Sequence, residues 1–275
     1  MKTLSKLIAA AGIAVIAAAG PVMAAGDVKP AKDVDFSFEG PFGTFDRGQL
    51  QRGYQVFTEV CASCHSMDLL AYRNLGDPGG PEFPEAQVKA FAASVEVADG
   101  PNDEGEMFER PGIPADRIQA PFANEKAARA ANDGAYPPDL TLMAKARAGY
   151  HGIITQLIKG SGGPEYIYSV LTGYQEPDAH AAEDAPEGKS YNPYFEAGPW
   201  ISMAPPLSDD QVEYSDGTAA TADQMAKDVS AFLMWAAEPK MEDRKSLGLR
   251  VLIFLLILGF LVYLTKKKIW RDVEH

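Results

Sequence analysis

Apolar residues recur with helical spacing most clearly in the stretch that follows Thr221. They occupy positions i, i+4, i+7, i+8 and i+11, which together form one face of an α-helix. The residues concerned are Met225, Val229, Phe232, Leu233 and Ala236. Thr221 and Gln224 match a capping box before this face, and Pro239 ends the helical pattern after it. The sequence therefore predicts an amphipathic helix whose apolar face needs a partner.

Shorter helical patterns are spread along the rest of the chain. The segment Gln49 to Val60 predicts a helix, and Tyr54 and Phe57 on one side of it offer the partner surface. Further helices are expected over Glu85 to Ala93, Glu125 to Asn132, Asp139 as N-cap towards Arg147, and Glu165 to Leu171. Long stretches rich in proline, glycine and acidic residues separate them, such as the arm from Ala25 to Asp46 and the loop near Asn102 to Arg110. The predicted fold is therefore mainly α with long loops.

The amino-terminal apolar run is typical of a signal peptide. Lys2 and Lys6 precede an apolar stretch, and small residues lead up to Ala24, so residues 1–24 are expected to be removed on export. An uncleaved anchor is the alternative, but this apolar stretch is short for a membrane span. Export places the following domain, residues 25–240, in the periplasm.

The carboxyl-terminal apolar run predicts a transmembrane helix. Leu247 to Leu264 is apolar except for Gly248 and Arg250, and it spans roughly 27 Å as a helix. A buried core helix is the alternative, because the uninterrupted part is shorter than most spans. The residues that follow are Lys266, Lys267, Lys268, Trp270 and Arg271, and such a boundary is typical of the cytoplasmic side. We therefore expect a hinge at Met241 to Ser246, a single-pass anchor within residues 241–265 and a cytoplasmic tail at 266–275, in a bacterial inner membrane.

Acidic residues outnumber basic ones, and the formal net charge is −13, which becomes −15 once Lys2 and Lys6 are removed. The acidic residues gather at 96–109, 176–187 and 209–216. This balance argues against nucleic acid as a partner, and it favours either a basic partner or simple solubility. Each cluster is either a solvated loop or a docking surface, and the sequence leaves both open.

The motif C-x-x-C-H at residues 61–65 concentrates the chemistry of the chain. Cys61 and Cys64 can each form a thioether with one vinyl group of a haem, and His65 can bind the iron as proximal ligand. A redox dithiol or a structural disulfide is the alternative. These are the only two cysteines, which excludes a four-cysteine zinc site, and a helix rather than a thioredoxin-like strand is expected before them. We therefore predict one covalently bound haem c per chain.

The residue opposite the proximal histidine decides what such a haem does. An open position suits a haem enzyme or a ligand sensor, whereas a second side chain suits electron transfer. Met203 lies in an apolar loop in which Pro205 and Pro206 restrict the backbone and can hold a thioether in place. His151 and His180 lie in glycine-containing and acidic surroundings, where a surface role is more common. We favour Met203 over a core-filling role, and hence an electron carrier, since the chain carries no nucleophile-elbow, metal-helix or phosphate-loop motif.

Five segments, at residues 61–67, 127–140, 168–174, 203–207 and 232–239, follow each other along nearly the whole mature chain. In this order they resemble cytochrome c1, the haem subunit of the cytochrome bc1 complex, of the proteobacterial type. The resemblance implies a cytochrome c-like haem domain with Met203 as sixth iron ligand. The other residues that it implies are Pro137 and Pro138 in the haem pocket, Asn132 and Arg147 near the propionates, and Tyr166 beside the haem. The stretch Gly149 to Gly163 resembles an insertion, and an extra cysteine pair found in some relatives is absent.

The resemblance also implies a function. The chain is expected to be the electron-transfer subunit of a ubiquinol–cytochrome c oxidoreductase, without a bond-making site of its own. It would accept one electron from the Rieske iron–sulfur protein and donate it to a soluble or membrane-anchored cytochrome c. Cytochrome b and membrane lipid are the further expected partners. A small anchored carrier that serves a different oxidase is the alternative.

Overall fold

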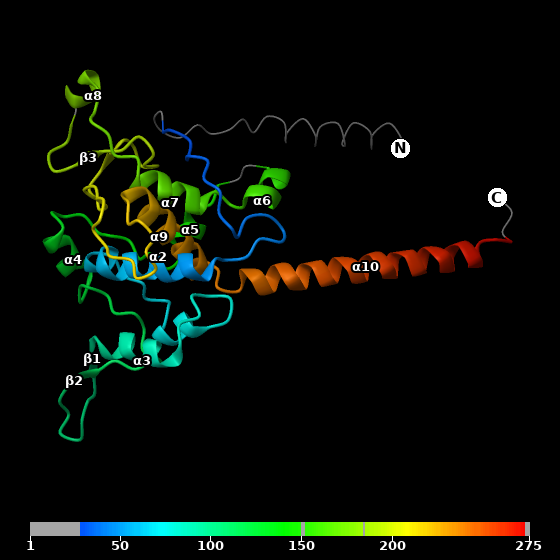
Figure 1. Ribbon diagram of the computed structural model, residues 1–275, viewed down its shortest axis with the longest axis horizontal. Helices are drawn as coiled ribbons and strands as arrows, with labels where there is room; N and C mark the ends of the chain where they lie inside the picture. The colour runs from blue at the N-terminus through cyan, green and yellow to red at the C-terminus, as the bar shows by residue number, and fades with distance from the viewer. Residues whose placement is uncertain (1–27, 150–151, 184, 273–275) are drawn as a thin grey trace, which may run out of the picture.

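The computed structural model describes residues 28–149, 152–183 and 185–272. A mainly helical domain is followed by one long helix, α10 (Met241–Ile269), which projects from the domain along the longest axis of the molecule (Figure 1). The predicted mainly α fold with a long carboxyl-terminal helix is thereby confirmed. The expected signal peptide lies outside the described residues, as does the end of the expected cytoplasmic tail.

The core of the domain is the contact between α2 (Arg47–Glu59) and α9 (Ala222–Ala237). The Phe232 ring centre lies 5.7 Å from that of Tyr54 and 6.0 Å from that of Phe57. All three side chains are buried, so the predicted pairing of the two helices is confirmed. Aromatic contacts of this kind bury large apolar areas and fix the relative position of the helices.

Both core helices begin with a side-chain cap. The Asp46 carboxylate accepts a hydrogen bond from the Gln49 amide at 2.9 Å, and the Thr221 hydroxyl accepts one from the Gln224 amide at 3.1 Å. These contacts satisfy amide groups that have no partner within the helix. The Gln224 side chain, however, donates to Asp228 at 2.8 Å, so the predicted capping box is replaced by a one-sided cap and a contact with the core.

A buried carboxylate lies between α2 and α9. Asp228 has no exposed surface, and its oxygens accept hydrogen bonds from Arg52 Nε at 2.9 Å and Gln49 Nε2 at 3.2 Å. The backbones approach closely here, because a Cβ on Gly53 would come within 2.2 Å of the Asp228 carbonyl oxygen. Since a buried charge must be paired and hydrogen-bonded, these contacts favour one register of α2 on α9.

The remaining elements surround this helix pair. They are η1 (Cys61–Ser63), η2 (Tyr72–Gly76), α3 (Glu85–Ala93), α4 (Glu125–Ala131), α5 (Met143–Ala146), α6 (Ile153–Lys159), α7 (Gly163–Leu171), α8 (Ala179–Glu183), β1 (Glu96–Asp99), β2 (Phe108–Pro111), β3 (Ser190–Tyr191) and β4 (Trp200–Ile201). In Figure 1, α3 and the β1–β2 hairpin extend from one end of the domain, and α8 and β3 lie at the other. The expected helices at α3, α4 and α7 are present within a few residues of their predicted bounds.

Two antiparallel strands lie on either side of the expected acidic loop and join it into a hairpin. Strand β1 pairs with β2 so that Glu96 faces Pro111 and Asp99 faces Phe108. Arg110 stabilises the hairpin, because its guanidinium pairs with both Asp99 and Asp116. The strands are largely exposed and lack alternating apolar residues, so the hydrophobic pattern does not indicate them.

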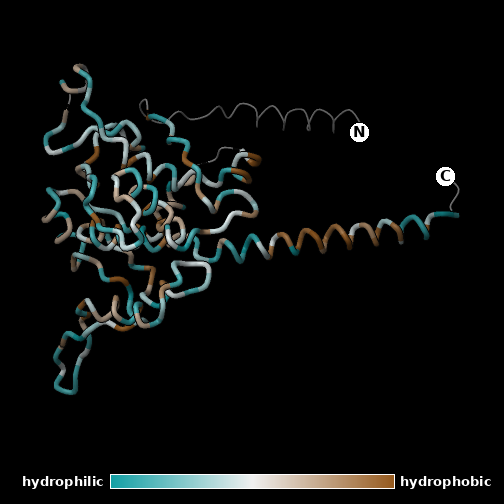
Figure 2. Tube along the Cα trace, viewed as in Figure 1, coloured by the Kyte–Doolittle hydropathy of each residue, from teal (hydrophilic) through white to brown (hydrophobic). Residues whose placement is uncertain are grey.

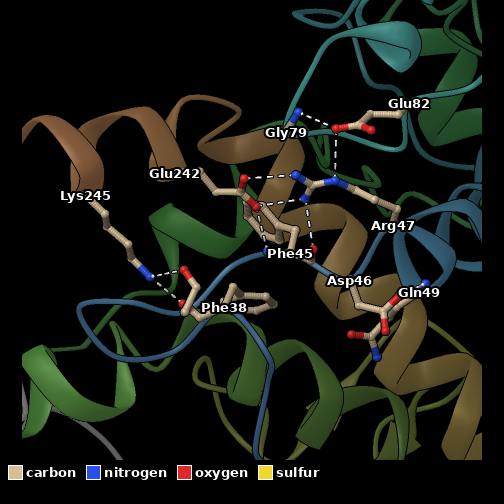
Figure 3. Close-up of polar contacts among 10 residues, drawn as sticks. Phe38, Phe45, Asp46, Arg47, Gln49, Gly79, Glu82, Glu242 and Lys245 are labelled. Atoms are coloured by element: carbon tan, nitrogen blue, oxygen red, sulfur yellow. Dashed lines mark hydrogen bonds and ion pairs between the residues drawn. The ribbon is translucent and has the colours of Figure 1, made fainter.

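Helix α10 is joined to the domain by charged side chains, which Figure 3 shows. Arg47 Nη1 and Nη2 donate to the two oxygens of the Glu242 carboxylate at 2.8 and 2.9 Å. The Phe45 amide donates to the same carboxylate at 2.7 Å. The segment Met241 to Ser246, expected as a hinge, therefore forms the first part of α10 and is held against the domain.

The middle of α10 is apolar on all sides (Figure 2). Its mean hydropathy reaches 2.6 over 18 residues, and none of that window is buried inside the domain. Among the described residues, α10 is the one helix that is long and apolar enough to cross a bilayer. Exposure on all sides excludes the alternative of a buried core helix, and α10 is the single membrane-spanning helix that the sequence predicts.

Replacing Asp228 with alanine should destabilise the domain by about 1–3 kcal/mol, because the side-chain amides of Gln49 and Gln224 would lose their acceptor and Arg52 would keep only the exposed Asp216 as a carboxylate partner. Urea unfolding of the full-length chain, followed by circular dichroism, measures this loss. Glu213→Ala removes an exposed carboxylate as the control and should change the stability by less than about 0.5 kcal/mol. An unchanged unfolding midpoint for Asp228→Ala would contradict the role given to this ion pair.

Candidate functional site

The C-x-x-C-H motif follows directly after α2. Its first residues form the single turn η1, and the amides of Cys64 and His65 both donate to the Cys61 carbonyl oxygen, at 3.1 and 2.9 Å. Cys61 packs against the apolar core, and so does Val60 before it. The core helix therefore ends in a tight turn that brings two thiols and an imidazole into one short segment.

The Cys61 thiol differs from an activated redox cysteine. Neither Cys61 nor Cys64 forms a disulfide, and the pKa of the Cys61 thiol is raised to about 12 by burial, with a smaller effect from the neighbouring Cys64. Redox-active cysteines have a lowered pKa instead, because the thiolate is the reactive species. Cys61 is therefore not placed as the attacking thiolate of a redox dithiol, and both sulfurs are free of a disulfide.

His65 contacts a backbone carbonyl through one ring nitrogen. Its Nδ1 lies 2.8 Å from the carbonyl oxygen of Pro138, which only a protonated ring nitrogen can approach as a donor. Burial lowers the pKa of the imidazole, although the bond to Pro138 acts in the opposite direction, and the neutral ring is favoured. Metal-binding histidines commonly donate their second ring nitrogen to a carbonyl in this way. The donor set therefore fits a haem whose iron is bound at Nε2.

Asp139 joins the segment that carries Pro138 to the motif. Its carboxylate accepts hydrogen bonds from the Ser66 hydroxyl at 2.9 Å and from the Asp68 amide at 2.7 Å. Burial alone would raise the pKa of Asp139, but these hydrogen bonds lower it, and the group is charged. The prediction of Asp139 as a helix cap is wrong, because α5 begins four residues later at Met143. The carboxylate instead aligns two loops.

A cavity of about 190 Å³ opens beside the motif. Cys64 and Pro137 line it, together with Ala128 of α4. The Asn132 side-chain nitrogen donates to the Ala128 carbonyl oxygen at 2.8 Å, so this amide is engaged at the end of its own helix. The structure thus brings both predicted prolines to the motif. The Asn132 side chain, in contrast, hydrogen-bonds to the last turn of α4.

Met203 lies near His65, on the loop that follows β4. The side chain is half-buried, and the Tyr174 hydroxyl donates to the Met203 carbonyl oxygen at 3.0 Å. Burial raises the pKa of Tyr174, so the hydroxyl keeps the proton that it donates. Sequence reasoning did not assign this role to Tyr174. Its place in the segment 168–174, one of those that carry the resemblance, is the signal that could have found it.

Arg147 and Tyr166 meet around a third residue, Glu196. Arg147 Nη1 pairs with the Glu196 carboxylate at 3.1 Å, and the guanidinium lies 5.8 Å from the centre of the Tyr166 ring. The Glu196 amide donates to the Tyr166 hydroxyl at 3.4 Å. The structure therefore brings these two predicted site residues together at the ends of α5 and α7, with an acidic partner that the sequence pattern did not indicate.

Two histidines were alternatives to Met203. His151 lies outside the described residues, and the side chain of His180 is not among those that the structure describes. Among the described residues, Met203 is the predicted donor that lies near His65.

Comparison with known proteins agrees with this geometry. The sequence profile of the Cytochrome C1 family matches residues 36–273. "Cytochrome c1" of Rhodospirillum rubrum is 49% identical over 94% of this chain and 97% of its own length, and "Cytochrome c1" of Cereibacter sphaeroides is 49% identical over 98% and 96%. "Cytochrome b/c1" of Bradyrhizobium diazoefficiens is 53% identical over 86% of this chain, which spans 35% of that relative. The chain belongs to the cytochrome c1 family, whose members carry a c-type haem in electron transport.

Proposed function

We propose that this chain is the haem-bearing electron-transfer subunit of a cytochrome bc1-type quinol–cytochrome c oxidoreductase. It takes one electron at a time from the Rieske iron–sulfur protein and passes it to a cytochrome c. The contact of His65 Nδ1 with the Pro138 carbonyl carries this proposal, because it leaves Nε2 for iron. The relative named "Cytochrome b/c1" supports cytochrome b as a neighbour.

Four side chains of this chain hold the haem in this proposal. Cys61 and Cys64 would attach it through thioethers, and His65 and Met203 would bind its iron. When bound, a haem c supplies a one-electron ferric/ferrous couple, and a thioether ligand raises its potential relative to a second histidine. The Tyr174 hydroxyl keeps the Met203 loop in place. An iron held by both side chains would have no free position for a small ligand, and such a site would suit electron transfer.

The remaining predicted residues shape the pocket. Pro137 and Pro138 form the wall beside the motif, which the cavity lined by Cys64 and Pro137 supports. Arg147, supported by the Tyr166 ring, offers a guanidinium to a propionate, with which it would form a charge-assisted hydrogen bond. Asn132 lies near the second propionate as its place in the family's pattern implies.

The chain lies across a bacterial inner membrane in this proposal, with the domain in the periplasm and α10 as its anchor. The lysines at 266–268 fit a cytoplasmic end of α10. The acidic surface of the domain fits a basic docking face on the cytochrome c, since opposite charges raise the rate of encounter. No role for nucleic acid fits this charge.

Met203→Leu should lower the haem midpoint potential by on the order of 0.1 V or more, because the ligand that favours ferrous iron is lost. Redox titration of the purified protein measures the shift. The ferrous variant should also bind carbon monoxide, which the wild-type protein should not.

Met107→Leu is the matched control, since this side chain is 66% exposed in the β1–β2 hairpin. It should leave the potential and the carbon monoxide spectrum unchanged. An unaltered potential in Met203→Leu, or immediate binding of the gas by the wild-type protein, would exclude Met203 as the ligand.

Electron transfer to a basic cytochrome c should slow as salt is added. We expect the bimolecular rate constant to fall about tenfold or more between low and physiological ionic strength, because added ions screen the attraction. Stopped-flow spectroscopy of the reduced protein measures this rate. Ferricyanide, an anionic oxidant, is the control, and its rate should rise with salt. A rate with cytochrome c that is independent of salt would refute electrostatic docking.

A further inference from the structure

Helix α6 presents its apolar side away from the domain. The exposed fractions are 76% for Ile153, 74% for Ile154, 58% for Leu157 and 57% for Ile158. At about 100° per residue, these four positions fall on one side of the helix, and Thr155, Gln156 and Lys159 fall on the other. A surface helix of a soluble domain has the opposite arrangement, with its apolar side towards the core.

The polar side of α6 is the side that the rest of the domain holds. Lys159 Nζ pairs with the carboxylates of Asp33 and Asp35, at 3.2 and 2.5 Å. Gln156 Nε2 donates to the Gly149 carbonyl oxygen at 2.9 Å. These contacts are all on the polar side of the helix, and the apolar side is exposed.

One loop contacts both α6 and the beginning of α10. A Cβ on Gly40 would lie 3.6 Å from the Ile158 carbonyl oxygen, so the loop abuts α6. Lys245 of α10 donates to the Phe38 carbonyl oxygen at 2.5 Å, as Figure 3 shows. Phe42 belongs to this loop and is 75% exposed. We call Phe42 and the four apolar residues of α6 the apolar patch.

The apolar patch lies at the level where α10 becomes apolar. Lys245 precedes Leu247, the start of the apolar run, by two residues, which is about 3 Å along a helix. In Figure 1 the longest axis is horizontal, and α6 lies on the side of the domain from which α10 leaves, further along that axis than the other labelled helices of the domain. Figure 2 shows the same strong hydropathy on α6 and on the middle of α10.

The junction with α10 keeps the apolar patch at this level. Arg47 holds Glu242 through two hydrogen bonds, and Met241 is 4% exposed. A helix fixed in this way cannot swing without breaking a partly buried, bidentate ion pair. A bilayer that surrounds the apolar part of α10 therefore reaches the apolar patch.

We propose that the apolar patch is a second membrane contact, inserted into the interfacial layer of the leaflet that α10 enters first. Its place beside the start of the membrane-spanning helix, at the level where α10 becomes apolar, identifies lipid as the occupant. The Lys159 ammonium group on the polar side of α6 stays at the level of the headgroups, which is how interfacial amphipathic helices lie. The contact fixes the tilt of the haem domain over the bilayer, in addition to the tether that α10 provides.

Photo-crosslinking in native membranes tests the proposal on the full chain in its own assembly. The photoreactive residue p-benzoylphenylalanine replaces Leu157 in one variant and Met107, in the distant hairpin, in the other. Mass spectrometry after illumination should find a phospholipid adduct at position 157 at least tenfold above that at position 107. A crosslink from position 157 to another protein, or an adduct yield equal to that at position 107, would overturn the proposal.

A second pair of variants tests whether α6 and Phe42 act together. With the photoreactive residue at position 42, Leu157→Glu should reduce the lipid adduct at least fivefold, because a carboxylate opposes insertion of the patch. Thr155→Glu adds the same charge to the polar side of the same helix and should leave the yield unchanged. Equal yields in the two variants would overturn the proposal. The haem spectrum of each variant reports an intact domain.

Discussion

The close contact of α2 with α9 is the constraint on which the rest of the structure depends. Gly53 lets the two backbones approach, and Asp228 and Arg52 make the arrangement specific, since any slipped register would leave a buried charge uncompensated. An apolar pair of similar size could stabilise the domain as much. The charged pair in addition favours one register of α2 on α9. This register determines where the haem-attachment motif begins.

The loops around the motif are then fixed through backbone carbonyl groups. His65 donates to the carbonyl of Pro138, and Tyr174 donates to that of Met203. The hydrogen bond that holds each loop is therefore independent of the side chain at that position of the loop. Chemistry at position 203 can change while the loop keeps its course, so that ligand identity and loop placement are separate properties of the chain.

The sequence predicts those parts of the structure that depend on local spacing. Helices α2 and α9, the motif and the apolar run of α10 follow from periodicity, charge and short-range pattern. The roles of Asp139 and Tyr174 do not, because their partners lie 71 and 29 residues away and no periodicity connects them. The β1–β2 hairpin is not predicted from the sequence for another reason: its strands bury little apolar surface, so they show no hydrophobic alternation. Helix α6 falls in the stretch that resembles an insertion, and its spacing does not reveal that the apolar side faces outward, since its polar side contacts Gly149, Asp33 and Asp35.

The direct continuation of the domain into α10 gives the chain an angular reference. Three residues, Glu238, Pro239 and Lys240, separate α9 from α10, and α10 is continuous from Met241 to Ile269. Each residue added or removed between the ion pair at Glu242 and the apolar run would turn the membrane segment by about 100° relative to the domain. The number of residues in this short stretch therefore determines how the haem domain is rotated about the axis of α10, relative to neighbouring molecules in the bilayer.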